Sequence, residues 1–126
     1  MKAYKVVLIG RRGWKNGPVL MSACARGEAM VYYARGQWSE APDWLWEGGY
    51  GLCCFETEEQ AKKFFNSIPF NYKELWEVEA EEVLTEIPPA MDLIALERKK
   101  IQGPIENGWA EGTIMARRVK LIRQIL

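Results

Sequence analysis

The residues best suited to bind a ligand in this chain are arginines and tryptophans near its two ends. Arginine gives bidentate contacts to phosphate, and tryptophan offers a flat ring on which a base can stack. These are parts of a nucleotide pocket, without any part that breaks a bond. The candidate ligand-binding residues are Arg11, Arg12, Trp14, Trp109, Arg117, Arg118, Lys120 and Arg123. A sheet edge at which two copies of the chain meet would use the same residues.

Catalytic and metal-binding side chains are scarce. The sequence contains no histidine, which excludes mechanisms that need an imidazole base and removes the usual zinc ligand set. Two of its three cysteines, Cys53 and Cys54, are adjacent, so they point to opposite faces of a strand and predict buried, reduced thiols. The carboxylates of residues 77–82 fit either a catalytic group or a solvated strand face. We expect no catalytic residue, no metal and no cofactor.

Charge is distributed unevenly, although the net charge is +0. Residues 1–27 carry six Lys or Arg and no acid, residues 28–97 carry four against fifteen Asp or Glu, and residues 98–126 carry seven against two. If both basic ends join one sheet, they make a basic patch suited to an anionic ligand. Alternatively, the basic ends neutralise the acidic middle strand by strand. The sequence leaves both interpretations open.

The pattern of the 126 residues predicts a single α+β domain, with a mostly antiparallel sheet of about six strands and one main amphipathic helix packed on it. The first three strands are expected to form an antiparallel meander. A less regular second helix is expected over residues 91–100. The expected strands span residues 3–9, 19–26, 30–34, 51–55, 75–83 and 113–125.

Residues 50–83 carry the clearest local signals. A continuous apolar run at 51–55 predicts a buried strand. Thr57 stands three residues before Gln60, the spacing of a capping box, and Pro69 ends the apolar stripe that follows, so the main helix is expected over 58–67. The acidic strand at 75–83 then alternates, and its natural partner by charge is the basic strand at 113–125.

Three tryptophans lie within residues 37–49, beside one proline and two glycines. Pro42 and Asp43 predict a short helix that carries Trp44. This segment is either a lid that covers one sheet edge with aromatic bulk, or an aromatic wall that stacks a base or another flat ligand. Both interpretations stay open.

The order of motifs resembles a family of small proteins encoded by phages and prophages. The motifs are Tyr-Lys-Val-Val from Tyr4, Trp-Ser-Glu-Ala-Pro from Trp38, Gly-Tyr-Gly-Leu-Cys-Cys-Phe-Glu-Thr from Gly49, Leu-Trp-Glu-Val-Glu-Ala from Leu75 and Gly-Thr-Ile-Met-Ala-Arg-Arg-Val-Lys-Leu from Gly112. Within this family, the chain resembles the anti-Thoeris sponge proteins, which sequester cyclic nucleotide signals of the host such as cyclic ADP-ribose. It implies a non-catalytic, homo-oligomeric sponge for an anionic nucleotide that blunts host defence.

A second resemblance is to part of the ADP-ribosyltransferase fold. A strand, a helix with Glu-x-Ala-x-x-Phe and a strand like Leu-Trp-Glu-Val-Glu carry it. Such enzymes need an Arg or His on an early strand, where this chain has Lys5. An ADP-ribosyltransferase-like enzyme is therefore one alternative, and a protein-interaction module that uses the Trp-rich segment is another.

No signal peptide opens the sequence, and no stretch approaches the roughly 20 apolar residues of a membrane span. We therefore expect a cytoplasmic protein, in the host cell cytoplasm if it is encoded by a phage. Its expected partners are a small anionic nucleotide and other copies of itself, with no membrane and no DNA or RNA.

Overall fold

The computed structural model describes residues 1–11, 18–22, 31–84, 86–87 and 109–126. They form a mixed α and β structure with a mostly antiparallel sheet, as predicted, but with seven strands instead of about six. The elements are β1 (Lys2–Arg11), β2 (Pro18–Ser22), β3 (Tyr32–Tyr33), β4 (Trp38–Glu40), α1 (Asp43–Glu47), β5 (Leu52–Phe55), α2 (Glu58–Ser67), β6 (Lys73–Val83) and β7 (Thr113–Gln124).

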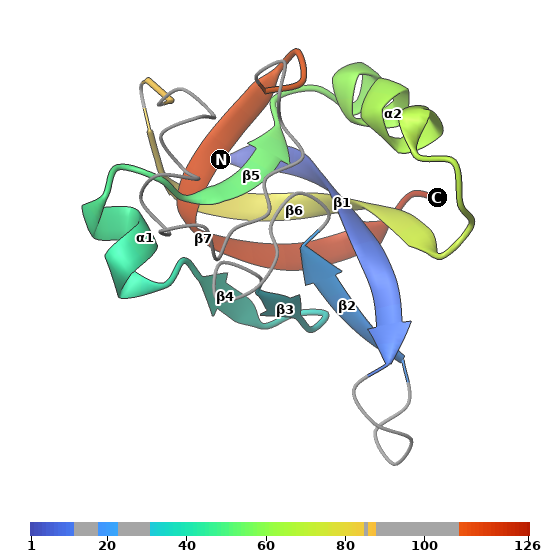
Figure 1. The fold of residues 1–126 in the computed structure, drawn as a ribbon, viewed down its shortest axis with the longest axis horizontal. Helices are drawn as coiled ribbons and strands as arrows, with labels where there is room; N and C mark the ends of the chain where they lie inside the picture. Colours follow the sequence, from blue (N-terminus) through green and yellow to red (C-terminus); the bar gives the residue numbers. More distant parts are fainter. Residues whose placement is uncertain (12–17, 23–30, 85, 88–108) are drawn as a thin grey trace.

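The sheet closes on itself. β6 pairs with β1 along one edge and with β7 along the other, while β5 pairs with β7 and, through Tyr4 and Phe55, with β1. Figure 1 shows β7 bending around the sheet, which allows its first part to pair with β5 and its later part with β6. The two basic ends of the chain, β1 and β7, therefore flank the acidic β6.

The predicted meander is confirmed where it is described. β2 pairs antiparallel with β1 and with β3. β3 is shorter than the expected strand at 30–34. Residues 23–26 of the expected second strand lie outside the described residues, as do residues 12–17, residue 30 and the expected helix at 91–100.

One strand of the seven, β4, was not predicted. It pairs antiparallel with β7, with Trp38 opposite Lys120 and Glu40 opposite Arg118. A strand of three residues is too short to show alternation, so its pairing with a distant strand was needed to identify it. The short helix predicted after Pro42 is confirmed as α1.

The core lies inside the closed sheet. Alternate residues of each strand point inward, and the buried cluster includes Ala3 and Val7 of β1, Val78 of β6 and Val119 and Leu121 of β7. The alternation predicted for residues 75–83 is confirmed, because Trp76, Val78 and Ala80 are buried between the glutamates. Burying such a side chain contributes about 1.5–3 kcal/mol for a large aliphatic or aromatic residue, so this interior stabilises the whole barrel-like sheet.

The helix α2 covers the outside of the sheet. Its N-cap Thr57 accepts a hydrogen bond from the backbone N–H of Gln60, and Ile68 is extended before Pro69, so both predicted ends are confirmed. Ala61 is fully buried against Val6, Phe55 and Leu75, which form a second cluster on the outer face of β1, β5 and β6. At the end of the helix, Lys73 donates to the carbonyl oxygens of Phe65 and Ile68. In the part of the chain that the structure describes, no helix is long and apolar enough to cross a membrane.

Candidate functional site

The outer face of β6 and β7 is a ladder of opposite charges. Glu77 lies opposite Arg123, Glu79 opposite Lys120 and Glu81 opposite Arg118. Arg123 donates to Glu77 at 3.1 Å, and Lys2 of β1 approaches the same carboxylate oxygen at 3.3 Å. The predicted charge pairing of these two strands is confirmed, because basic side chains on both flanking strands contact the acidic β6.

The Glu77 carboxylate shows the electrostatic effect of this pairing. Its pKa is lowered from the ordinary value of 4.5, chiefly because Arg123 donates a hydrogen bond to the charged form, with a further contribution from Lys2. The ionised form is therefore favoured in the folded protein.

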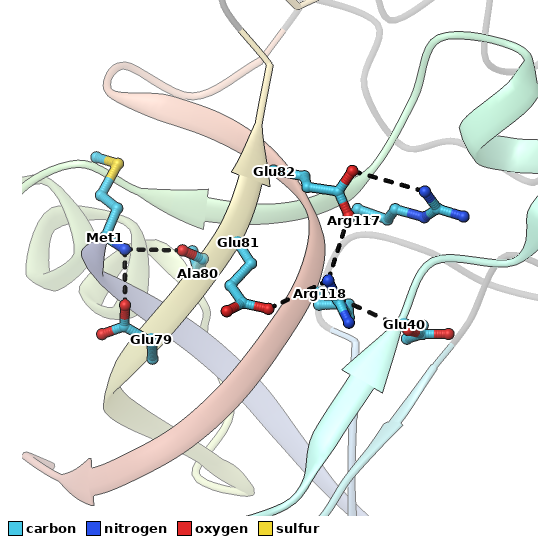
Figure 2. Close-up of polar contacts among 8 residues, drawn as sticks. All are labelled: Met1, Glu40, Glu79, Ala80, Glu81, Glu82, Arg117 and Arg118. Carbon is cyan, nitrogen blue, oxygen red and sulfur yellow. Dashed lines mark hydrogen bonds and ion pairs between the residues drawn. The ribbon is translucent and has the colours of Figure 1, made fainter.

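Arg118 lies among three carboxylates. Its guanidinium nitrogens are 3.8 Å from Glu40, 3.3 Å from Glu81 and 3.4 Å from Glu82. Glu82 has a positive φ of 55°, a conformation that non-glycine residues adopt rarely, and its carboxylate also lies 3.6 Å from Arg117. Figure 2 shows Glu82 between Arg117 and Arg118, with Glu40 on the far side of Arg118. These two arginines are engaged by the protein's own carboxylates.

A groove of about 560 Å³ lies beside this cluster. The amino group of Met1 donates to the Glu79 side chain at 2.7 Å and to the carbonyl oxygen of Ala80 at 2.9 Å (Figure 2). Three of the side chains that line the groove are carboxylates, so the groove does not favour an anionic ligand. Its lining residues are Met1, Glu79, Ala80, Glu81, Glu82, Val83 and Arg118.

Lys120 has a different environment, although it lies only two residues after Arg118 on the same outer face. Its ammonium nitrogen is 4.8 Å from the centre of the Trp38 ring, within the range of a cation–π contact. Among the described residues no carboxylate forms an ion pair with Lys120. The nearest opposed carboxylate in the pairing, Glu79, accepts from the Met1 amino group. Lys120 is therefore a cation held on an aromatic ring.

Trp38 is the exposed tryptophan of the described residues, with 39% of its surface accessible. Trp76 is buried, and Trp44, Trp46 and Trp109 pack partly buried against the inner cluster. On the neighbouring β3, Tyr32 is 41% exposed, and Ser39 of β4 donates to its carbonyl oxygen. A flat ring beside a cation can stack a base and contact an anionic group, so Trp38 and Lys120 form the candidate site.

The predicted site residues whose side chains the structure describes, namely Trp109, Arg117, Arg118, Lys120 and Arg123, do not line one common pocket. Arg12 and Trp14 lie outside the described residues, and Arg11 ends β1. Arg117, Arg118 and Arg123 contact glutamates, and Trp109 packs against the core. A second hollow, of about 270 Å³, lies next to the turn that follows Trp109, but its lining includes none of the five described site residues. Among the predicted cations whose side chains the structure describes, Lys120 lies over an exposed aromatic ring and has no carboxylate partner among the described residues.

Lys5 is a buried charged residue, a position that we did not predict from the sequence. It is 4% exposed, its ammonium donates to the carbonyl oxygen of Cys53, and it lies 4.9 Å from the centre of the Tyr33 ring. The alternation of Ala3, Lys5 and Val7 was the signal that Lys5 points inward.

The two adjacent cysteines differ in burial. Burial raises the pKa of the Cys54 thiol, and the charge of the neighbouring Lys5 opposes this in part. The burial predicted for Cys54 is confirmed, whereas Cys53 is partly exposed.

Within the described residues, no group of three or more Cys, Asp or Glu side chains is arranged to hold a metal ion. Comparisons of the chain with protein-family models, with curated proteins and with solved structures found no match.

Proposed function

We propose that this chain is a non-catalytic protein that binds a flat, nucleotide-like anion at Trp38 and Lys120. The observation that carries this proposal is the exposed Trp38 ring with the Lys120 ammonium 4.8 Å from its centre. A base stacks on the ring, and the anionic group of the ligand contacts the ammonium. By its resemblance to small phage proteins, the chain would sequester such a signalling molecule and so blunt a host defence.

The paired arginines revise the position of this site. An anion that approaches Arg118 or Arg123 meets carboxylates that already neutralise those guanidinium groups. Displacing an ion pair offsets most of the gain from a new one. Lys120 requires no such displacement, which supports a site on the outer face of β4 and β7.

The ADP-ribosyltransferase-like alternative has less support. The early-strand residue that such an enzyme would use, Lys5, points into the core. Glu79 and Glu81 line the groove on the outer face of β6, on the opposite side of the sheet. No shared cleft among the described residues joins Lys5 to these carboxylates.

A protein-interaction module is the second candidate, and the same exposed aromatic residues favour it. Tryptophan and tyrosine are enriched at protein interfaces, and Trp38 and Tyr32 are exposed on β4 and β3, which are joined by the hydrogen bond from Ser39 to the carbonyl oxygen of Tyr32. In this case the partner surface, or a second copy of the chain, would cover Trp38 in place of a nucleotide.

Native mass spectrometry separates these functions. The protein is incubated with lysate of cells whose nucleotide-signalling defence is active, and the Trp38→Ala variant is treated in parallel. The proposal predicts a small adduct on the wild-type protein, released intact on heating and absent from the variant. A released molecule of altered mass indicates an enzyme, and a bound protein without a small adduct indicates the interaction module. The same spectra report whether the protein is a homo-oligomer.

A further inference from the structure

In the part of the chain that the structure describes, one cation contacts the exposed ring of the candidate site. Lys120 is the cation that touches the exposed ring, and on the same strand Arg118 is engaged by Glu40, Glu81 and Glu82. A ligand with one negative charge is neutralised by one ammonium group. Of the other described cations of this region, Arg117 and Arg118 lie beside carboxylates. Arg35, whose backbone bridges to Leu121, has its guanidinium 6.0 Å from the centre of the ring of the buried Trp76.

Carboxylates surround Lys120 on the outer face of the sheet. Glu79 is its direct partner on β6, with about 4.5–5.5 Å expected between opposed Cβ atoms. Glu40 follows Trp38 on the same face of β4, and Glu81 follows Glu79 on the same face of β6. Glu79 pairs with the Met1 amino group, and Glu40 and Glu81 share the single charge of Arg118 with Glu82. These carboxylates are therefore neutralised in part, and a polyphosphate bound at Lys120 would lie close to the remaining negative charge.

From this arrangement we infer that the Trp38–Lys120 site selects a flat ring that carries a single negative charge over one that carries several. The class includes cyclic mononucleotides, in which a phosphodiester carries one charge, whereas a phosphomonoester carries about −1.5 to −2 at pH 7. This inference rests on the proposed function and specifies the ligand class of the same site.

A series of adenine compounds tests the inference, because the ring stays constant while the charge increases. Binding of adenosine, 3′,5′-cyclic AMP, AMP and ATP is measured by isothermal titration calorimetry at low ionic strength, without added magnesium. Cyclic AMP is expected to bind most tightly. Adenosine is expected to bind about three- to tenfold more weakly, because it makes no charged contact with Lys120. Each charge beyond the first is expected to weaken binding by about threefold through repulsion by the surrounding carboxylates.

The four titrations distinguish a failure of the charge selectivity from a failure of nucleotide binding itself. If AMP or ATP binds more tightly than cyclic AMP, the selectivity is overturned while nucleotide binding stands. Equal affinity for adenosine and cyclic AMP overturns it as well, because Lys120 then contributes nothing. If none of the four compounds binds, the proposed function itself fails.

A charge-relief variant provides an independent test. Glu40→Gln with Glu81→Gln removes two carboxylates from the face, leaves Trp38 and Lys120 in place, and leaves Arg118 with Glu82 as its carboxylate partner. This variant is expected to gain at least threefold in affinity for ATP, with a smaller gain for cyclic AMP and no change for adenosine. Its fold is checked by circular dichroism. An unchanged ratio of ATP to cyclic AMP affinity in the folded variant contradicts the inference.

Discussion

Arg118 and Lys120 lie two residues apart on the same face of β7, yet their surroundings differ. Arg118 contacts three carboxylates from β4 and β6, whereas Lys120 lies over the ring of Trp38. The first arrangement neutralises the protein's own acidic strand, and the second leaves a cation beside an exposed aromatic surface. Basic residues on the same face of one strand can therefore have different contacts, according to which side chains lie opposite each of them.

The largest expected effect follows from removing the ring. Trp38→Ala is expected to weaken binding of cyclic AMP by at least tenfold, because base stacking on an aromatic side chain contributes about 1–3 kcal/mol. Calorimetric titration of the variant measures the change. Tyr72→Ala is the matched control, since Tyr72 is 52% exposed and stacks on Phe70 outside the site. Equal affinity losses in the two variants would place the ligand elsewhere.

The second largest effect is expected on the free energy of unfolding when Arg118 is substituted. Arg118→Gln leaves Glu40, Glu81 and Glu82 facing one another without their shared cation. We expect a loss of about 1 kcal/mol in the free energy of unfolding, measured by urea denaturation, and a smaller loss at high salt. The control is Lys120→Gln, for which a change within about 0.5 kcal/mol is expected, as for most surface substitutions. Indistinguishable losses would remove the distinction between the two cations.

The charge of Lys120 provides the third comparison. Lys120→Gln is expected to weaken cyclic AMP binding by about three- to tenfold and to reduce its dependence on salt, because one charge-assisted contact is lost. Arg123→Gln removes the same charge from the same strand, but from a residue that contacts Glu77. A change within about twofold is expected for that control, as for a distant screened charge. A larger loss for Arg123→Gln would assign the ligand to the arginine pairs.

The smallest effect is the pH dependence of the ion-pair ladder. Because the pKa of Glu77 lies below 4.5 in the folded protein, the folded state binds fewer protons than the unfolded state at this group. Its stabilising contribution is complete above about pH 4.5 and is lost as the pH falls through the lower folded value. Glu77→Gln should therefore lose less stability on acidification than the wild type, as measured by urea denaturation at several acidic pH values. Arg123→Gln removes the hydrogen bond that lowers the pKa of Glu77 most, so this variant should also lose less stability on acidification than the wild type. Parallel curves for all three proteins would show that the pair has no linked effect.

Much of the fold was predictable because its signals are local. The spacing of Thr57, Gln60 and Pro69 identified both ends of α2, and the alternation of residues 75–83 identified the inward face of β6. The pairing of β6 with β7 followed from their opposite charges. The closure of the sheet was not predicted, since it depends on the bend of β7 and on a single pair between Tyr4 and Phe55.

The candidate site was predicted only in part. Lys120 was named with seven other residues, and Trp38 belonged to a segment with two open interpretations. Their contact depends on the pairing of β4 with β7, which joins residues far apart in the sequence through a strand of three residues. Neither charge patterning nor periodicity encodes such a pairing. The pairing of the β7 arginines with the glutamates of β6 was one of the two interpretations that the sequence left open, whereas Glu40 of β4 was not identified as a partner of Arg118.

The most direct test of the Trp38–Lys120 site is the nuclear magnetic resonance signal of the Trp38 indole N–H. The ¹⁵N-labelled protein contains six tryptophans, and a Trp38→Phe variant assigns the signal of Trp38. On titration with cyclic AMP, this signal is expected to shift in a saturable way, while the signal of the buried Trp76 stays in place. A Trp38 signal that does not move, whether or not the signals of other tryptophans shift, would contradict binding at this site.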